Sequence, residues 1–127
     1  MHLFIGSINN WEEENEYITL YNLDIPKHGG DWFHIHYETV DRDVSKKPEI
    51  VFDVRVTPWT FCEDNKYEVV IDTESGEVVF DNEKNEIKEE YFKEINRILE
   101  PGGRFYCYRR NGNFRNLFIY IKPENKE

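Results

Sequence analysis

The chain has 127 residues, 39% of them hydrophobic and 16% aromatic, which is enough for one domain with a packed interior and excludes a disordered chain. Asp and Glu number 26 against 16 Lys and Arg, so the net charge is -10 and non-specific binding to a phosphate backbone is disfavoured unless the few cations cluster. No run of about 18 apolar residues occurs, which excludes a membrane-spanning helix.

The cysteines and the N-terminal segment indicate the compartment. Cys62 and Cys107 do not form a CxxC pair and are too few for a disulfide framework, so we interpret them as free thiols in a reducing compartment. The N-terminal segment MHLFIGS lacks the basic region and the long apolar stretch of a signal peptide. We therefore expect a cytoplasmic protein, or one in the interior of a virion if its origin is viral.

Much of the chain has the β-branched and aromatic composition of strands. In chain order, strands are predicted at residues 2–5, 16–25, 33–40, 49–56, 66–73, 104–110 and 114–123. Segment 75–81 is interpreted either as a further short strand or as a connection. The sequence Asn-Gly-Asn at 111–113 is typical of a hairpin turn, so the last strand is predicted to pair antiparallel with the one before it, over 116–122.

The clearest element is a helix over residues 83–99. Its apolar residues recur at intervals of three and four, which is the spacing of one helix face: Ile87, Tyr91, Phe92, Ile95, Ile98 and Leu99. Asp81 or Asn82 is predicted to cap its start. The Pro-Gly-Gly sequence at 101–103 is predicted to end it, because Pro cannot donate the next hydrogen bond and Gly accepts a positive φ.

Two motifs carry a resemblance to a known family. The first comprises Pro58, Trp59, Phe61, Asp64, Asn65, Tyr67, Glu68, Val70 and Ile71. The second comprises Glu94, Ile95, Arg97, Ile98, Leu99, Pro101, Gly102, Gly103 and Arg104, with Glu100 where Lys is usual. Both motifs follow the sequence LFIGS and the Leu-Asp pair at 23–24. With its motifs in this order, the chain resembles the small class I S-adenosylmethionine-dependent methyltransferases, and the resemblance covers residues 2–110.

The resemblance implies an α/β fold in one methyltransferase-like domain over residues 1–127. It implies a Rossmann-like, mostly parallel sheet with the first strand in a central place and an antiparallel C-terminal strand. In such sheets, ligands lie at the carboxyl ends of the strands beside the topological switch point.

The resemblance also implies S-adenosylmethionine as cofactor and assigns its contacts. Gly6, Ser7 and Asn9 would form the turn under the methionine and ribose, Asp24 would accept the ribose hydroxyls, and Asp53 would face the adenine amino group. Asp72, at the end of the fourth strand, would lie nearest the reacting methyl group as the candidate catalytic residue. The alternative is that each Asp is a turn or cap residue, as an Asp after a strand often is.

Several features depart from the family pattern. Ile8 stands where the cofactor loop of the family has glycine, and a β-branched side chain there cannot let the backbone approach a ligand. Residues 26–47 are interpreted as an insertion and 123–127 as a frayed tail, and we expect a truncated fold that lacks parts of the substrate pocket. Two hypotheses stay open: a methyltransferase-like protein of unknown acceptor with lost or partner-dependent activity, and a non-catalytic structural or interaction module.

A parallel sheet needs cover on both faces, and only one helix is clearly predicted. We expect the insertion, a second copy of the chain or another protein partner to provide this cover and to complete the substrate pocket. Aromatic residues serve as anchors in such interfaces. The candidate anchors are Trp32, Phe33, Tyr37, Trp59 and Phe61.

Two further clusters lie outside the resemblance. The basic patch around the predicted hairpin comprises Arg109, Arg110 and Arg115 with Tyr108 and Phe114. Its simpler interpretation is a solvated hairpin tip, and the alternative is a contact with an anion such as nucleic acid. His34 and His36 could share a metal ion, but such pairs are usually the polar face of a strand, so no metal is predicted.

Overall fold

A computed structural model of the chain describes residues 1–6, 37–46, 48–72, 80–81, 86–111 and 114–124, with side chains except at 46, 80–81, 86–87 and 108–117. The predicted strand at 16–25 lies outside these residues, as does most of the predicted insertion. So do the individual residues Ser7, Ile8, Asn9, Asp24, Trp32, Phe33, His34 and His36. No helix in the described part of the chain is long and apolar enough to cross a membrane.

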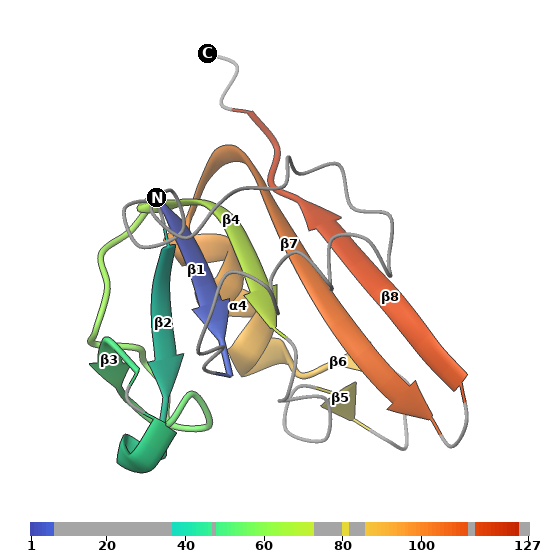
Figure 1. Ribbon diagram of the computed structural model, residues 1–127. Coiled ribbons are helices and arrows are strands. Elements are labelled where there is room, and N and C mark those ends of the chain that lie inside the picture. The colour runs from blue at the N-terminus through green and yellow to red at the C-terminus, as the bar shows by residue number, and fades with distance from the viewer. Residues whose placement is uncertain (7–36, 47, 73–79, 82–85, 112–113, 125–127) are drawn as a thin grey trace.

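The described elements form one main sheet, a small second sheet and one α-helix (Figure 1). They are β1 (His2–Ile5), β2 (Tyr37–Asp41), the 3-10 helix η1 (Val44–Lys46), β3 (Ile50–Val51), β4 (Tyr67–Asp72), β5 (Phe80–Asp81), β6 (Glu86–Ile87), α4 (Glu89–Ile98), β7 (Leu99–Asn111) and β8 (Phe114–Ile121). The main sheet has six strands in the order β3-β2-β1-β4-β7-β8, and β5 pairs antiparallel with β6.

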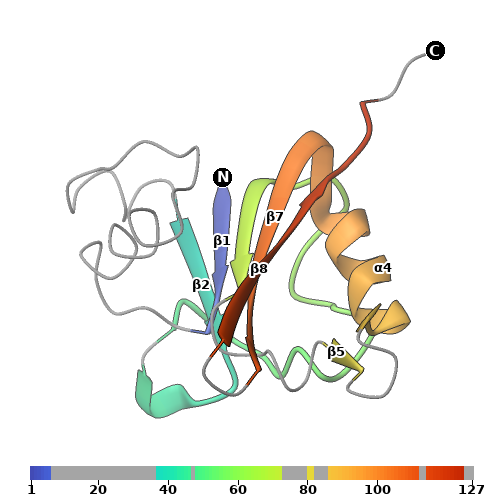
Figure 2. The same ribbon diagram turned by 90° about the vertical axis from the view of Figure 1, so that its right-hand side faces the viewer.

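The strand order and directions confirm the predicted fold class. β1 pairs parallel with β2 on one side and with β4 on the other, β2 pairs parallel with β3, and β4 pairs parallel with β7. Only β8 runs antiparallel, beside β7. This is the strand order of doubly wound Rossmann-like sheets, in which the first strand is central and the order reverses beside it. Helix α4 lies on one face of the sheet (Figure 2).

The strand beside β1 corrects one assignment. Residues 16–25, with Asp24 near their end, were predicted as the second strand, but both edges of β1 are occupied, by residues 37–40 of β2 and 69–72 of β4. The neighbour of β1 therefore comes from within the segment 26–47 that was interpreted as an insertion. Both segments have strand composition, and local pattern does not tell which of them pairs with β1.

Two predicted elements are shorter than expected. The strand predicted at 49–56 is only β3, because the Asp53 side chain accepts the backbone N–H of Arg55 and its carbonyl accepts that of Val56, which turns the chain. The helix predicted from residue 83 begins at Glu89 with Lys88 as an extended N-cap residue, because β6 pairs with β5 just before it. Asp81 and Asn82 therefore do not cap the helix.

Other predicted bounds shift outward. β7, predicted at 104–110, begins directly where α4 ends and reaches Asn111, whereas β8 begins at Phe114 as predicted for 114–123 and ends at Ile121. The predicted strands at 2–5 and 66–73 agree with β1 and β4, and β5 lies within the segment 75–81 that was left open. Since Asn111 is opposite Phe114 in the register, the two strands form the predicted antiparallel hairpin.

The core lies between α4 and the sheet. The helix contributes Tyr91, Ile95 and Ile98, all buried, which confirms part of the predicted apolar face. Ile87 and Leu99, also assigned to that face, lie in β6 and β7 instead. Residues on the opposite face of the sheet are buried as well, among them Phe4, Val69, Ile71 and Tyr106. Toward α4 the sheet contributes alternate strand residues. They are Leu3, Ile5, Val40, Val70, Phe105 and Cys107. Trp59, predicted as an exposed anchor for a partner, is instead 2% exposed within this core.

The Pro-Gly-Gly corner lies in the first residues of β7, just after the end of α4. Leu99 is opposite Tyr67, but the next paired positions are Arg104 and Val69, so β7 carries extra residues that bulge out of the ladder. Gly102 adopts φ +83°, which an L side chain rarely does. The helix itself ends at Ile98, before the corner, with Leu99 already extended, so the corner sets the register of β7 rather than ending the helix as predicted.

Gly103→Ala tests this close packing. A Cβ at residue 103 would lie 2.8 Å from the carbonyl oxygen of Glu100 and 3.1 Å from those of Tyr67 and Glu68. Because all three atoms are backbone and cannot retract, we expect a loss of about 1–3 kcal/mol in the free energy of unfolding, measured by urea denaturation. Pro101→Ala at the exposed apex of the corner serves as control, with a change within about 1 kcal/mol. Equal stability of Gly103→Ala and the parent chain would contradict the packing.

Candidate functional site

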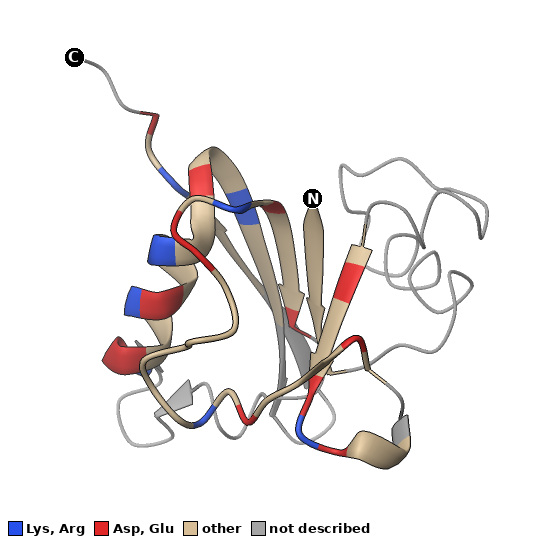
Figure 3. Ribbon diagram, turned by 90° about the vertical axis from the view of Figure 1, so that its left-hand side faces the viewer, with Lys and Arg blue, Asp and Glu red and all other residues tan. Residues whose placement is uncertain are grey.

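The carboxyl ends of the parallel strands meet at one edge of the sheet. Ile5, the last residue of β1, is opposite Val40 on one side and Asp72 on the other. Gly6 follows β1, Asp41 ends β2 and Asp72 ends β4, so these three residues lie at the same edge. Figure 3 shows acidic residues where β2 and β4 end. This edge, at the point where the strand order reverses, is where doubly wound sheets bind ligands.

Gly6 and Asp41 form the part of this edge beside β1. Gly6 has φ +92° and donates its N–H to the carbonyl of Val40 at 3.0 Å. The half-buried Asp41 accepts the N–H of Asp43 through Oδ1 at 2.8 Å, which leaves its second oxygen outside that turn. Sequence reasoning missed Asp41, although the signal was present: the alternating segment 33–40 is followed directly by an acid.

Asp53 lies just beyond β3 and is tied to Arg55. The guanidinium of Arg55 donates from Nε to Oδ1 at 2.9 Å and to Oδ2 at 3.1 Å, and from Nη2 to Oδ2 at 2.6 Å. This side-chain hydrogen bonding lowers the pKa of Asp53 to about 2, so the residue is ionised at neutral pH. A ligand amino group could reach Asp53 only through lone pairs that Arg55 leaves open.

Asp72, the candidate catalytic residue, is 1% exposed. Its Oδ2 accepts a hydrogen bond from the hydroxyl of Tyr91, a residue of the first turns of α4. The ring of Tyr91 packs edge-on against Trp59, and Cys107 is opposite Asp72 in the register of β7. Burial raises the pKa of both the Tyr91 hydroxyl and the Cys107 thiol, so both stay protonated. Asp72 is thus enclosed between the sheet and the helix.

The edge therefore brings together only part of the predicted site. Gly6 and Asp72 flank the same end of β1, whereas Asp53 follows the edge strand β3, which β2 separates from β1. Ser7, Asn9 and Asp24 lie outside the described residues. Among the residues that the structure does describe, no three His, Cys, Asp or Glu side chains are grouped so that they could hold a metal ion.

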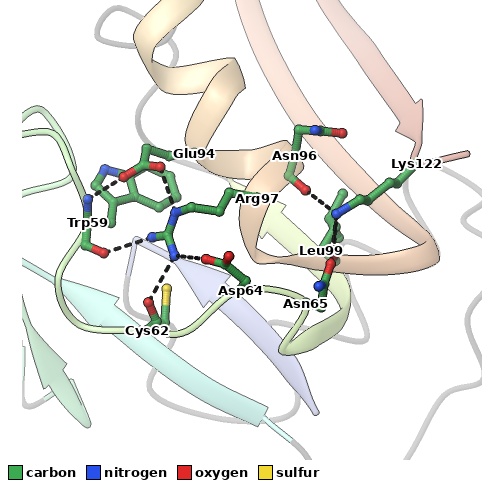
Figure 4. A network of polar contacts seen from close by, with 9 residues as sticks. All are labelled: Trp59, Cys62, Asp64, Asn65, Glu94, Asn96, Arg97, Leu99 and Lys122. Atoms are coloured by element: carbon green, nitrogen blue, oxygen red, sulfur yellow. Dashed lines mark hydrogen bonds and ion pairs between the residues drawn. The ribbon is translucent and has the colours of Figure 1, made fainter. Parts of the chain in front are cut away.

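The two family-like motifs meet around Arg97 in a set of contacts that we call the Arg97 cluster (Figure 4). Its members are Trp59, Cys62, Asp64, Glu94 and Arg97. The Arg97 guanidinium donates to Glu94 Oε2, to Asp64 Oδ1 and to the carbonyl of Trp59, each at 2.8 Å, and to the carbonyl of Cys62 at 3.3 Å. Glu94 in turn accepts the backbone N–H of Trp59.

The Arg97 cluster sets the charge state of Glu94. Burial opposes ionisation of Glu94, but the hydrogen bonds from Arg97 and from the Trp59 N–H outweigh it, so its pKa is lowered. The hydrogen bond to Glu94 raises the pKa of Arg97. Burial raises the pKa of the neighbouring Cys62 thiol to about 11, so this cysteine is not a reactive thiolate at neutral pH.

A second set of contacts caps the carboxyl end of α4. The ammonium of Lys122 donates to the carbonyls of Asn96 and Leu99 at 2.7 and 2.8 Å and to the side chain of Asn65 at 2.9 Å. The backbone N–H of Asn65 donates to the carbonyl of Arg97. A cation at the carboxyl end of a helix satisfies unpaired carbonyls and complements the helix dipole. The motif residues thus join α4 to the segment before β4, away from the carboxyl edge.

Solved structures similar in fold include methyltransferases. An S-adenosylmethionine-dependent methyltransferase from Mesorhizobium loti aligns with a TM-score of 0.49 and 10% identity over 94% of this chain and 56% of its own. A chain of the Haloferax volcanii complex between the Trm112 methyltransferase activator and a proposed methyltransferase aligns with a TM-score of 0.47 and 18% identity, over 85% and 44%. The present chain thus spans about half the length of these matches. No family model and no curated protein matches the sequence.

Arg97→Met tests the structural role of the Arg97 cluster. The substitution keeps most of the aliphatic length but leaves the buried Glu94 carboxylate without its cation, so we expect a loss of about 2–4 kcal/mol in the free energy of unfolding. Lys93→Met, on the exposed side of α4, is the matched control and should change stability by less than about 0.5 kcal/mol. Urea denaturation measures both. Similar stabilities for the two variants would show that the cluster is not needed to hold α4.

Proposed function

We propose that the chain is an S-adenosylmethionine-dependent methyltransferase-like protein that binds its cofactor at the carboxyl edge of β1 and β2. One observation carries the proposal: the register of Ile5 with Val40 sets the positive-φ turn at Gly6 beside Asp41. A glycine turn after the first strand and an acid at the end of its neighbour are what Rossmann-like sheets use for a nucleoside ligand.

The residues at this edge fit the proposed cofactor chemically. S-adenosylmethionine carries a sulfonium cation and an amino group, and Asp41 and Asp53 bring negative charge to the edge that would receive it. The carboxylate of Asp41 has acceptor capacity beyond the bond from Asp43, which two ribose hydroxyls require. Gly6 has no side chain to hold a ligand away from the backbone. Ser7, Asn9 and Asp24 stay candidate contacts from the sequence.

The bound cofactor would supply an activated methyl group, and the chain would hold it and orient it toward an acceptor. The acceptor is not assigned. We do not assign Asp72 the role of a base that contacts the acceptor, because its carboxylate is enclosed beneath Tyr91. We assign it the positioning of α4 instead.

The enclosure of Asp72 is also the observation that favours a second candidate, a non-catalytic methyltransferase fold that serves as a structural or interaction module. In both cases a second copy or a protein partner would complete the substrate pocket or the cover of the sheet. Binding of the cofactor separates the two candidates, since only the first requires it.

Calorimetric titration with S-adenosylmethionine tests the proposed function. The parent chain should bind, and Asp41→Asn should bind at least about tenfold more weakly, because it loses charge-assisted hydrogen bonds while it keeps the acceptor for Asp43. Asp43→Asn, in the same turn and with the same change of charge, is the control and should retain the parent affinity.

Two results would overturn the proposal. The absence of heat and of a thermal shift with millimolar cofactor would remove cofactor binding and leave the non-catalytic module. Equal weakening in Asp41→Asn and Asp43→Asn would reduce the effect to net charge and remove Asp41 as the ribose ligand.

A further inference from the structure

The two edge strands of the main sheet differ in length and composition. At one margin, β3 has only two residues and the turn at Asp53 follows it. At the other margin, β8 has eight residues, and its register with β7 runs without a shift from Phe114 to Ile121 (Figure 1). Native proteins protect an edge by keeping it short or by placing Pro, Lys or a bulge in it. β3 is protected by its length, whereas β8 has none of these features.

The backbone of β8 directs every second residue away from β7. Lys122, just after the strand, donates its N–H to the carbonyl of Gly103 at 2.9 Å and accepts the N–H of Gly102 at 3.0 Å. Because the hydrogen-bonding groups of successive strand residues point to opposite sides, those of Ile121 and Ile119 point away from β7. Among the residues that the structure describes, no strand lies on that side of β8. This edge of the ladder can therefore accept another strand.

Two exposed isoleucines accompany this edge. Tyr120 faces α4, where its hydroxyl donates to the side chain of Asn96 at 2.6 Å, so the odd-numbered positions of β8 lie on the other face. Ile119 is 51% exposed and Ile121 is 60% exposed. Cross-strand pairs of apolar side chains stabilise strand pairing. The edge thus offers a second strand both hydrogen-bonding groups and apolar contact area.

The charges that flank β8 favour a second copy of the chain as that strand. Arg115 stands near the amino end of β8, and Glu124 follows its carboxyl end. Antiparallel pairing of two β8 strands about a two-fold axis at Ile119 sets positions 114 and 115 of one copy opposite positions 124 and 123 of the other. The cationic end of each strand then lies beside the acidic end of its partner, twice by symmetry.

An axis at Ile119 also pairs apolar positions with apolar positions. Opposed residues of antiparallel strands share a face, so position 119 meets its own copy and position 121 meets position 117, which is a leucine. The ammonium of Lys122 is bonded to the carbonyls of Asn96 and Leu99 at the end of α4, so it does not stand at the contact. The strand is thus complementary to itself.

We propose that two copies of the chain associate through antiparallel pairing of their β8 strands, which forms one continuous sheet across the dimer. A contact of one strand per copy is small beside the roughly 1,200–2,000 Å² of a standard interface, so the dimer is weak, with a dissociation constant on the order of micromolar. This edge-to-edge contact is distinct from cover on the faces of the sheet. It does not depend on cofactor binding at the carboxyl edge.

Sedimentation equilibrium of the full chain between about 1 and about 100 μM tests the proposal, because a weak dimer dissociates on dilution. The parent chain should change from monomer to dimer across this range. Ile119→Lys places two cations together at the axis and should stay monomeric. Val51→Lys makes the same change of charge at a residue of β3 that is 55% exposed, and as the matched control it should dimerise like the parent chain.

Ile119→Pro separates strand pairing from side-chain contact. The N–H that it removes points away from β7, so the hairpin keeps its ladder and the thermal midpoint should change by no more than a few degrees. The dimer loses hydrogen bonds at the axis and should be at least about tenfold weaker. A parent chain that stays monomeric throughout the range would overturn the proposal and leave the edge to a strand of another protein. Unchanged dimerisation in either Ile119 variant, or equal loss in Val51→Lys, would also overturn it.

Discussion

The guanidinium of Arg97 is the contact on which the described fold depends most. It is the point where the helix, the segment before β4 and the family-like motifs meet, through Glu94, Asp64 and the carbonyl of Trp59. These bonds orient α4 across the sheet, and the orientation of α4 decides where β7 starts. Because β7 follows the helix without a connecting loop, an error in the position of α4 would pass into the register of β7 and β8.

The two motifs, which are the most recognisable part of the sequence, therefore stabilise the fold rather than form the ligand edge. The motif residues that resemble methyltransferases hold α4 and turn the chain at the Pro-Gly-Gly corner, while the ligand edge that we propose lies at the carboxyl ends of β1 and β2. Asp72 links the two regions, since it ends a strand at the ligand edge and receives the hydroxyl of Tyr91 from α4. A chain could thus keep the motifs for stability whether or not it keeps the methyl-transfer chemistry.

Local patterns in the sequence predicted the positions of the helix and strands better than they predicted which strands pair with one another. The apolar period of α4, the strand composition of β4 and that of the segments that become β7 and β8 are local signals, and the described residues follow them. The neighbour of β1 could not be chosen, because residues 16–25 and 33–40 have the same strand composition and pairing is a tertiary choice. The sequence also could not predict that Asp72 is enclosed, because Tyr91 is 19 residues away and contacts it only through tertiary packing.

The proposed ligand edge and the Arg97 cluster are separate parts of the molecule. Backbone amide chemical shifts in a titration with S-adenosylmethionine test this separation most directly. The largest shift changes should occur at Gly6, at residues 41–43 and at Arg55, while the amides of Asn65 and Arg97 should change little. Largest changes at Asn65 and Arg97, or no change anywhere at millimolar cofactor, would contradict the account.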